Sequence, residues 1–149
     1  ITAAVDATPV TAGDRVERAV SRGEALLAEM RDAVRETGDR RLQARVDSFA
    51  ERARGLFRLV EDDPRRLAPV RRYLGVYLQG ARDSARQYAA LDRQRGDVQA
   101  RRRFELLLDD LEADFAARTD QLLADDRDAL DLEIDVLRER LRREGVEPE

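Results

Sequence analysis

The chain has 149 residues, the size of one domain with a substantial core; 42% of them are hydrophobic, 40% charged and 5% aromatic, and the net charge is −4. Histidine, cysteine and lysine are absent, which excludes a disulfide framework and leaves no histidine or lysine base for a nucleophilic triad. Few aromatic residues and only four prolines favour helices over sheets, and no apolar run approaches the ~20 residues of a membrane-spanning helix.

The first half of the chain predicts a helical hairpin. Residues 1–11 lack periodicity and are expected to be a disordered lead-in. Residues 12–61 are expected to form two antiparallel helices, because Thr37-Gly38-Asp39 supplies a helix-ending glycine and a capping aspartate with almost no connector. The expected buried stripes are Val16, Val20, Gly23, Leu27, Met30 and Val34, followed by Leu42, Val46, Phe49, Ala53, Leu56 and Val60.

Two further long helices are expected after the boundary at Asp62-Asp63-Pro64, over residues 69–92 and 97–125. Gly75 and Gly80, inside the first of them, are expected to permit close approach of a neighbouring backbone. The expected buried residues are Val70, Leu74, Tyr77, Ala81, Ser84, Tyr88 and Leu91, then Phe104, Leu108, Leu111, Phe115, Arg118 and Leu122, with Leu107 and Leu123 beside them.

The C-terminal pattern is ambiguous. Leu130, Leu132, Ile134 and Val136 alternate as in a strand, whereas Leu130, Ile134, Leu137 and Leu141 fit a helix. A lone strand would have nothing to pair with, so we expect a break near Asp125–Asp128, a last helix over 130–144 and a tail over 146–149.

The fold predicted from these elements is all-α: a single domain over 12–145, built as an elongated antiparallel bundle of four long helices plus one or two short helices. The spacing of three and four also suits coiled-coil packing, so dimerisation through an extended helix is left open.

The charges are strongly segregated along the chain. Residues 40–103 hold 17 arginines and 8 acids, and residues 104–135 hold 2 arginines and 12 acids. Such opposed blocks indicate either two segments packed side by side, which we favour, or a polar face offered to a partner.

Acidic residues near the C-terminus form the only candidate metal site. Asp125, Asp126 and Asp128 are weak candidates for Mg²⁺ or Ca²⁺ ligands, since hard cations take carboxylate oxygens. They lack a calcium-loop pattern, and we favour a solvated helix face or a helix start, with no metal and no cofactor.

Arginine pairs form the candidate phosphate site. Arg65, Arg66, Arg71 and Arg72 are weak candidates, because guanidinium groups suit phosphate. No aromatic residues alternate with them as a base-stacking platform, so we disfavour nucleic acid as a partner. Binding to an anionic membrane or nucleic-acid surface is kept as an alternative function. The sequence contains no Gly-rich phosphate loop before a helix and no GxSxG-type turn around a serine, so we predict no catalytic residue.

Two runs carry a resemblance: LFRLVEDDPRRLAPVRRYLGVYLQGARDSARQYAAL and LLDDLEADFAARTDQLLADDRDALDLEIDVLRERL. They resemble the bacterial XpaC-like family, whose members are named 5-bromo-4-chloroindolyl phosphate hydrolysis proteins, over roughly Leu56 to Leu141. The resemblance implies association with a TelA-like protein of toxic-anion resistance, relatives with extra N-terminal sequence, and, by the family name, phosphate-ester hydrolysis.

We expect a non-catalytic helical interaction or scaffold domain in an envelope or toxic-anion stress response. We expect it to bind a protein partner, and homo-oligomerisation is left open. The alternative is a metal-dependent phosphate-ester hydrolase. Because the chain begins at Ile1 and not at Met, we expect sequence upstream of it. We expect a cytoplasmic protein whose only route to a membrane is that upstream segment.

Overall fold

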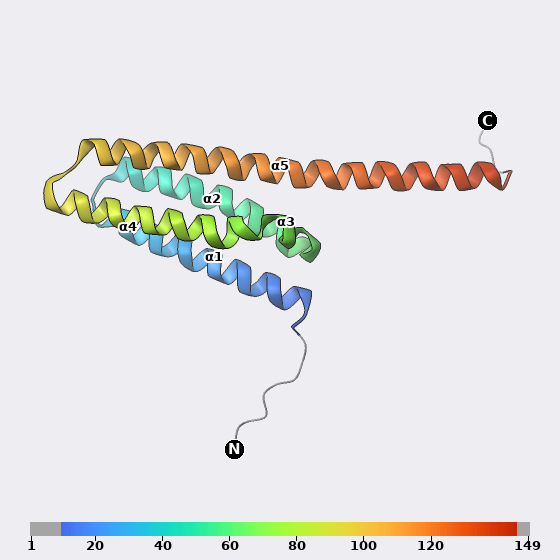
Figure 1. The fold of residues 1–149 in the computed structure, drawn as a ribbon, viewed down its shortest axis with the longest axis horizontal. Coiled ribbons are helices and arrows are strands. Elements are labelled where there is room, and N and C mark those ends of the chain that lie inside the picture. The colour runs from blue at the N-terminus through green and yellow to red at the C-terminus, as the bar shows by residue number, and fades with distance from the viewer. Residues whose placement is uncertain (1–9, 146–149) are drawn as a thin grey trace, which may run out of the picture.

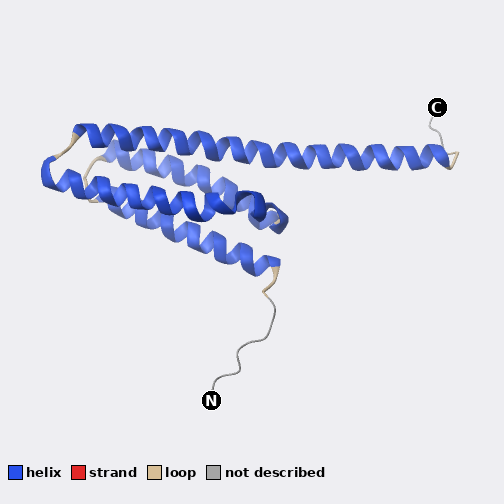
Figure 2. Cartoon of the chain, viewed as in Figure 1, coloured by secondary structure: helices blue, strands red, loops and turns tan. Residues whose placement is uncertain are grey.

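The structure, a computed structural model, describes residues 10–145 and is all-α, with no strand among those residues. The expected all-α fold with four long helices is therefore confirmed (Figures 1 and 2). Residues 1–9 and 146–149, within the expected lead-in and tail, lie outside the described residues. The elements are α1 (Ala12–Arg35), α2 (Arg40–Asp62), η1 (Pro64–Arg66), α3 (Leu67–Arg72), η2 (Tyr73–Tyr77), α4 (Leu78–Arg95) and α5 (Val98–Arg143).

Side-chain caps define the ends of these helices. Thr11 caps α1, with its hydroxyl accepting from the Asp14 N–H and the Asp14 carboxylate accepting from the Thr11 N–H. Gly38, at φ +72°, closes the end of α1, and Asp39 accepts from the Leu42 N–H at 3.0 Å to begin α2. The predicted hairpin joint is thus confirmed.

The third helical region begins earlier than predicted. It is helical from Pro64 and not from Pro69, because Asp63 caps η1 and Pro64 takes a first-turn position. Within it, η2 is a π-helical turn, which inserts one extra residue into the helical register. The buried position after Leu74 is Leu78, four residues further on. The predicted burial of Tyr77 and Leu91 was wrong: they are 39% and 43% exposed.

The core lies between four helices. Helix α1 packs against α2 and α4, α2 packs against α5, and α4 contacts α5. The two predicted stripes of the hairpin are confirmed as buried, with Val20 half-buried. Phe115 of α5 forms edge-to-face contacts with Phe49 at 5.2 Å and with Tyr73 at 5.1 Å between ring centroids, which joins α2, η2 and α5 at the centre.

Glycine permits close helix packing at one position that was not singled out. A Cβ on Gly23 of α1 would lie 2.6 Å from Cζ of Phe57 on α2, so only glycine admits that buried ring. The role expected for Gly75 and Gly80 was wrong, because a Cβ at either position meets nothing within 4 Å.

Helix α5 is a single element of 46 residues, about 69 Å long at 1.5 Å per residue. The break expected near Asp125–Asp128 was wrong: neither glycine nor proline interrupts this stretch, and the helix continues through it. Its last buried residue is Leu122, and the remainder projects beyond the bundle (Figure 1). No helix within residues 10–145 combines the length and apolar character needed to cross a bilayer.

Candidate functional site

The projecting part of α5, Leu123–Arg143, is here called the distal segment. Apolar side chains that a bundle helix would bury are open to solvent along it. One set falls on a single side of the helix at spacings of seven, four, three and four residues, and we call it the seam. Its members are Leu123, Leu130, Ile134, Leu137 and Leu141, each between 38% and 58% exposed.

The helical spacing of these residues was predicted correctly. The prediction that the bundle buries them was wrong. The seam turns away from the line of Phe115 and Leu122 that faces the bundle, and no other element of the described chain covers it. Leu132 is also exposed, at 65%, on the side of the helix opposite the seam.

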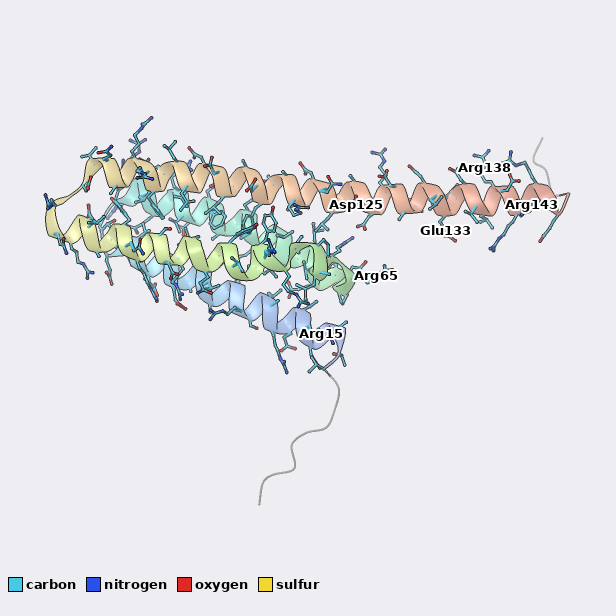
Figure 3. All side chains as sticks on the ribbon, in the orientation of Figure 1. Arg15, Arg65, Asp125, Glu133, Arg138 and Arg143 are labelled. Atoms are coloured by element: carbon cyan, nitrogen blue, oxygen red, sulfur yellow. The ribbon has the colours of Figure 1, made fainter. Side chains whose placement is uncertain are left out.

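The charges of the distal segment divide along its length. Residues 125–135 hold six acids and one arginine, whereas residues 138–143 hold four arginines and one glutamate. In Figure 3 the side chains of Glu133, Arg138 and Arg143 extend from this helix into open space. The segment therefore presents an apolar line with an acidic end and a basic end.

The three weak metal candidates do not converge. Asp125 accepts from Nε2 of Gln121 at 3.0 Å, Asp126 pairs with Arg66, and Asp128 points into solvent. Within residues 10–145 no three or more acidic side chains are grouped so that they could hold a metal ion. The arrangement therefore gives Asp125 and Asp126 local bonding roles and leaves Asp128 in solvent.

The four candidate phosphate-binding arginines are likewise dispersed. Arg65 forms a two-point ion pair with Asp63, at 3.1 and 3.0 Å, and this hydrogen bonding lowers the pKa of Asp63. Arg66 pairs with Asp126, and its Nη1 donates to the Leu59 carbonyl at 2.8 Å. Arg72 is exposed and forms no ion pair with any described residue. Two of the four are thus engaged in holding helix ends.

Arg71 instead lines an open cleft of about 460 Å³ between the start of α1 and α3. Arg15 and Arg18 of α1 line the same cleft, at the end of the bundle where Figure 3 labels Arg15. None of these three arginines forms an ion pair within residues 10–145. Sequence reasoning missed Arg15 and Arg18; their i, i+3 spacing was the available signal.

Ion pairs between packed elements join the two charge blocks at two places, Arg45 with Asp109 and Arg66 with Asp126. A third pair, Arg101 with Glu105, is formed four residues apart within α5. Arg101 also donates to Asp39 at 2.6 Å, and this bond lowers the pKa of the Asp39 carboxyl. The favoured interpretation of the blocks, packing side by side, therefore accounts for part of the acidic block only. Asp131, Glu133 and Asp135 form no ion pair with any described residue.

Comparison with known proteins shows which family the chain belongs to. The family model described as 5-bromo-4-chloroindolyl phosphate hydrolysis protein matches residues 7–137. The chain belongs to this family. No curated protein and no solved structure matches the chain. The resemblance seen from Leu56 onward is thus confirmed, and the match takes in the hairpin of α1 and α2 together with the distal segment as far as Leu137.

Proposed function

We propose that this member of the 5-bromo-4-chloroindolyl phosphate hydrolysis protein family is a helical interaction domain that binds a protein partner through the seam and performs no chemistry itself. The observation that carries the proposal is the exposure of the seam on a helix that projects from its own bundle. Contiguous apolar side chains left open on a soluble surface mark interaction sites, and a helix gains most of its stability by burying such a face.

The carboxylates of the bundle support a structural role. The pKa values of Glu29, Asp39 and Asp63 are all lowered, in each case chiefly by a hydrogen bond from an arginine. A general acid needs the opposite, a carboxyl whose pKa is raised by desolvation. Glu29 and Asp39 pair with arginines of α4 and α5 and so join elements that are distant in sequence, whereas Asp63 pairs with Arg65 within one turn.

The test is affinity capture with seam variants. The full chain is immobilised and exposed to an extract of the source organism, in parallel with Leu130→Gln/Leu137→Gln and with the control Leu132→Gln, which removes a leucine from the opposite side of the helix. The expected result is a partner retained by the wild type and the control and lost by the seam variant. A TelA-like protein and a second copy of this chain are the two candidate partners that the capture distinguishes. Retention by all three proteins would contradict the proposal.

A second candidate function is binding or hydrolysis of a phosphate ester in the cleft of Arg15, Arg18 and Arg71. The family description and the three arginines without an ion pair in the described chain favour it. Hydrolysis of 5-bromo-4-chloroindolyl phosphate by purified protein, lost in Arg71→Gln and kept in the neighbouring Arg72→Gln, would establish this function. Absence of turnover, together with no heat on titration with inorganic phosphate, would eliminate it.

A further inference from the structure

We infer that the partner bound by the seam is a second copy of this chain, and that the two distal segments pair antiparallel. The inference rests on the proposed function and names its partner. It comes from the positions of charged residues on either side of the seam.

The seam defines a heptad register. With Ile134 and Leu141 at the first core position and Leu130 and Leu137 at the second, four core residues follow one another at spacings of four, three and four. The positions that flank such a core are then fixed. They are Asp131 and Arg138 on one flank, and Glu133 and Arg140 on the other.

In an antiparallel pair, Leu130 meets Leu141 of the second copy and Ile134 meets its Leu137. Each flank then faces the same flank of the second copy. Asp131 comes opposite Arg138 and Glu133 opposite Arg140, and each pair occurs twice because of the two-fold symmetry. One layer further out, Arg127 comes opposite Glu144. Every flanking contact in this register joins opposite charges.

The alternative pairings bring like charges together. A parallel pair keeps one attractive flank contact, Glu133 with Arg138 of the second copy, but aligns Arg127 with Arg127 in the core and places Asp126 beside Asp131 of the second copy. An antiparallel pair shifted by one heptad places Asp131 opposite Asp131 and Glu133 opposite Glu133. Because charges at flanking positions set the orientation of coiled coils, the sequence of the distal segment favours the antiparallel register, the one of these three pairings that has no like-charge contact.

The same charged residues have no ion-pair partner within the described chain. Asp131, Glu133, Arg138 and Arg140 appear in none of its ion pairs, whereas Glu139, on the outer side of the helix, pairs with Arg142 at 3.3 Å and Arg143 at 3.5 Å. Arginines near a helix C-terminus also suit the helix dipole. The dipole acts only at the ends of a helix and does not account for acids on both flanks of the seam, well before the last turn of α5.

The pairing buries four layers of apolar side chains, which is less than a standard interface of about 1,600 Å². Association is therefore expected to depend on protein concentration. It is also expected to weaken as salt screens the exposed flanking pairs.

Sedimentation of the full chain over a range of concentrations and salt tests the inference. The expected result is a monomer–dimer equilibrium that shifts toward monomer at high salt. Asp131→Arg/Glu133→Arg and Arg138→Glu/Arg140→Glu should each weaken self-association by more than about tenfold, since each places like charges on both flanks. An equimolar mixture of the two variants should associate again. The matched control, Asp128→Arg/Asp135→Arg, makes the same change of net charge on the outer side of the helix and should dimerise as the wild type does.

Orientation is measured with a spin label. The chain has no cysteine, so Asp125→Cys provides one labelled position per copy. In the antiparallel register the two labels are separated along the axis by 21 residues, about 32 Å at 1.5 Å per residue. In a parallel pair they lie side by side, and a distance below about 20 Å would overturn the inference.

A wild type that stays monomeric at every concentration, or a mixture of variants that does not associate, would also overturn it. The capture experiment with Leu130→Gln/Leu137→Gln distinguishes failure of the self-pairing inference from failure of the proposed function. If that variant loses a protein partner while the wild type is monomeric, self-pairing is wrong and the proposed function stands.

Discussion

Arg66 in η1 forms an ion pair with Asp126 of α5, and its Nη1 also donates to the Leu59 carbonyl of α2. Among the described residues, Asp126 is the last side chain of α5 that bonds to another element. The pair therefore marks the point at which α5 leaves the bundle. One guanidinium ties together the end of α2, the turn that follows it and the start of the distal segment.

Removing that guanidinium should destabilise the bundle. For Arg66→Ala we expect the free energy of unfolding to fall by about 1–2 kcal/mol, because a largely buried side chain loses hydrogen bonds to a carboxylate and a carbonyl. Arg65→Ala is the matched control. The Arg65 side chain is 91% exposed, and its exposed pair with Asp63 should contribute little, because solvent screens it. Urea unfolding measures both; equal losses would contradict the role given to Arg66.

Two glycines should respond in opposite ways to the same substitution. Gly23→Ala places a Cβ 2.6 Å from the buried ring of Phe57, so we expect a net loss of about 1–2 kcal/mol in spite of alanine's better helix propensity. At Gly80 a Cβ meets nothing within 4 Å, and Gly80→Ala should stabilise the protein by about 0.5–1 kcal/mol. Thermal unfolding distinguishes them. A stabilised Gly23→Ala would show that α1 and α2 do not pack as described.

Asp39 should make stability depend on pH. The hydrogen bond from Arg101, supported by the Leu42 N–H, lowers the pKa of Asp39 from its ordinary value of 3.8. The folded state thus favours the ionised carboxylate. The resulting stabilisation is complete above the ordinary pKa and is lost as pH falls through the lower, folded-state pKa.

Asp39→Asn removes the stabilisation that the ionised carboxylate provides. We expect the variant to be less stable than the wild type by about 1–2 kcal/mol at pH 7, with the difference shrinking below about pH 4. Urea unfolding at several pH values tests it, with Asp128→Asn as a control because Asp128 has no ion-pair partner in the described chain. A difference that stays constant down to pH 2 would show that the ionised form is not what stabilises the joint.

Much of the bundle was predictable because its helices obey one period. In α1 and α2, burial follows the spacing of three and four residues from Val16 to Val60 almost without exception. Around η2 the buried residues are Val70, Leu74, Leu78 and Ala81, at spacings of four, four and three, which a period of 3.6 residues also allows. The strict alternation of four and three in the prediction placed Tyr77 at that position instead of Leu78.

The site was harder to predict than the fold. Acids at 125–128 suit a helix start as well as a helix middle, so local sequence could not decide between a break and a continuous helix. The leucines of the seam form the same stripe whether their own chain covers them or another molecule does. Only the length of the α1–α4 bundle, which ends beside Leu122 and Asp126, determines which residues of α5 are left open.

Hydrogen exchange along α5 tests the central claim most directly. Amide exchange is measured on the full chain, alone in dilute solution and in the complex that it forms, whether with itself or with a captured protein. We predict that binding slows exchange within residues 123–143 and leaves the buried stripes of α1 and α2 unchanged. Slower exchange on the bundle with no change in residues 123–143 would contradict the assignment of the distal segment as the interaction surface.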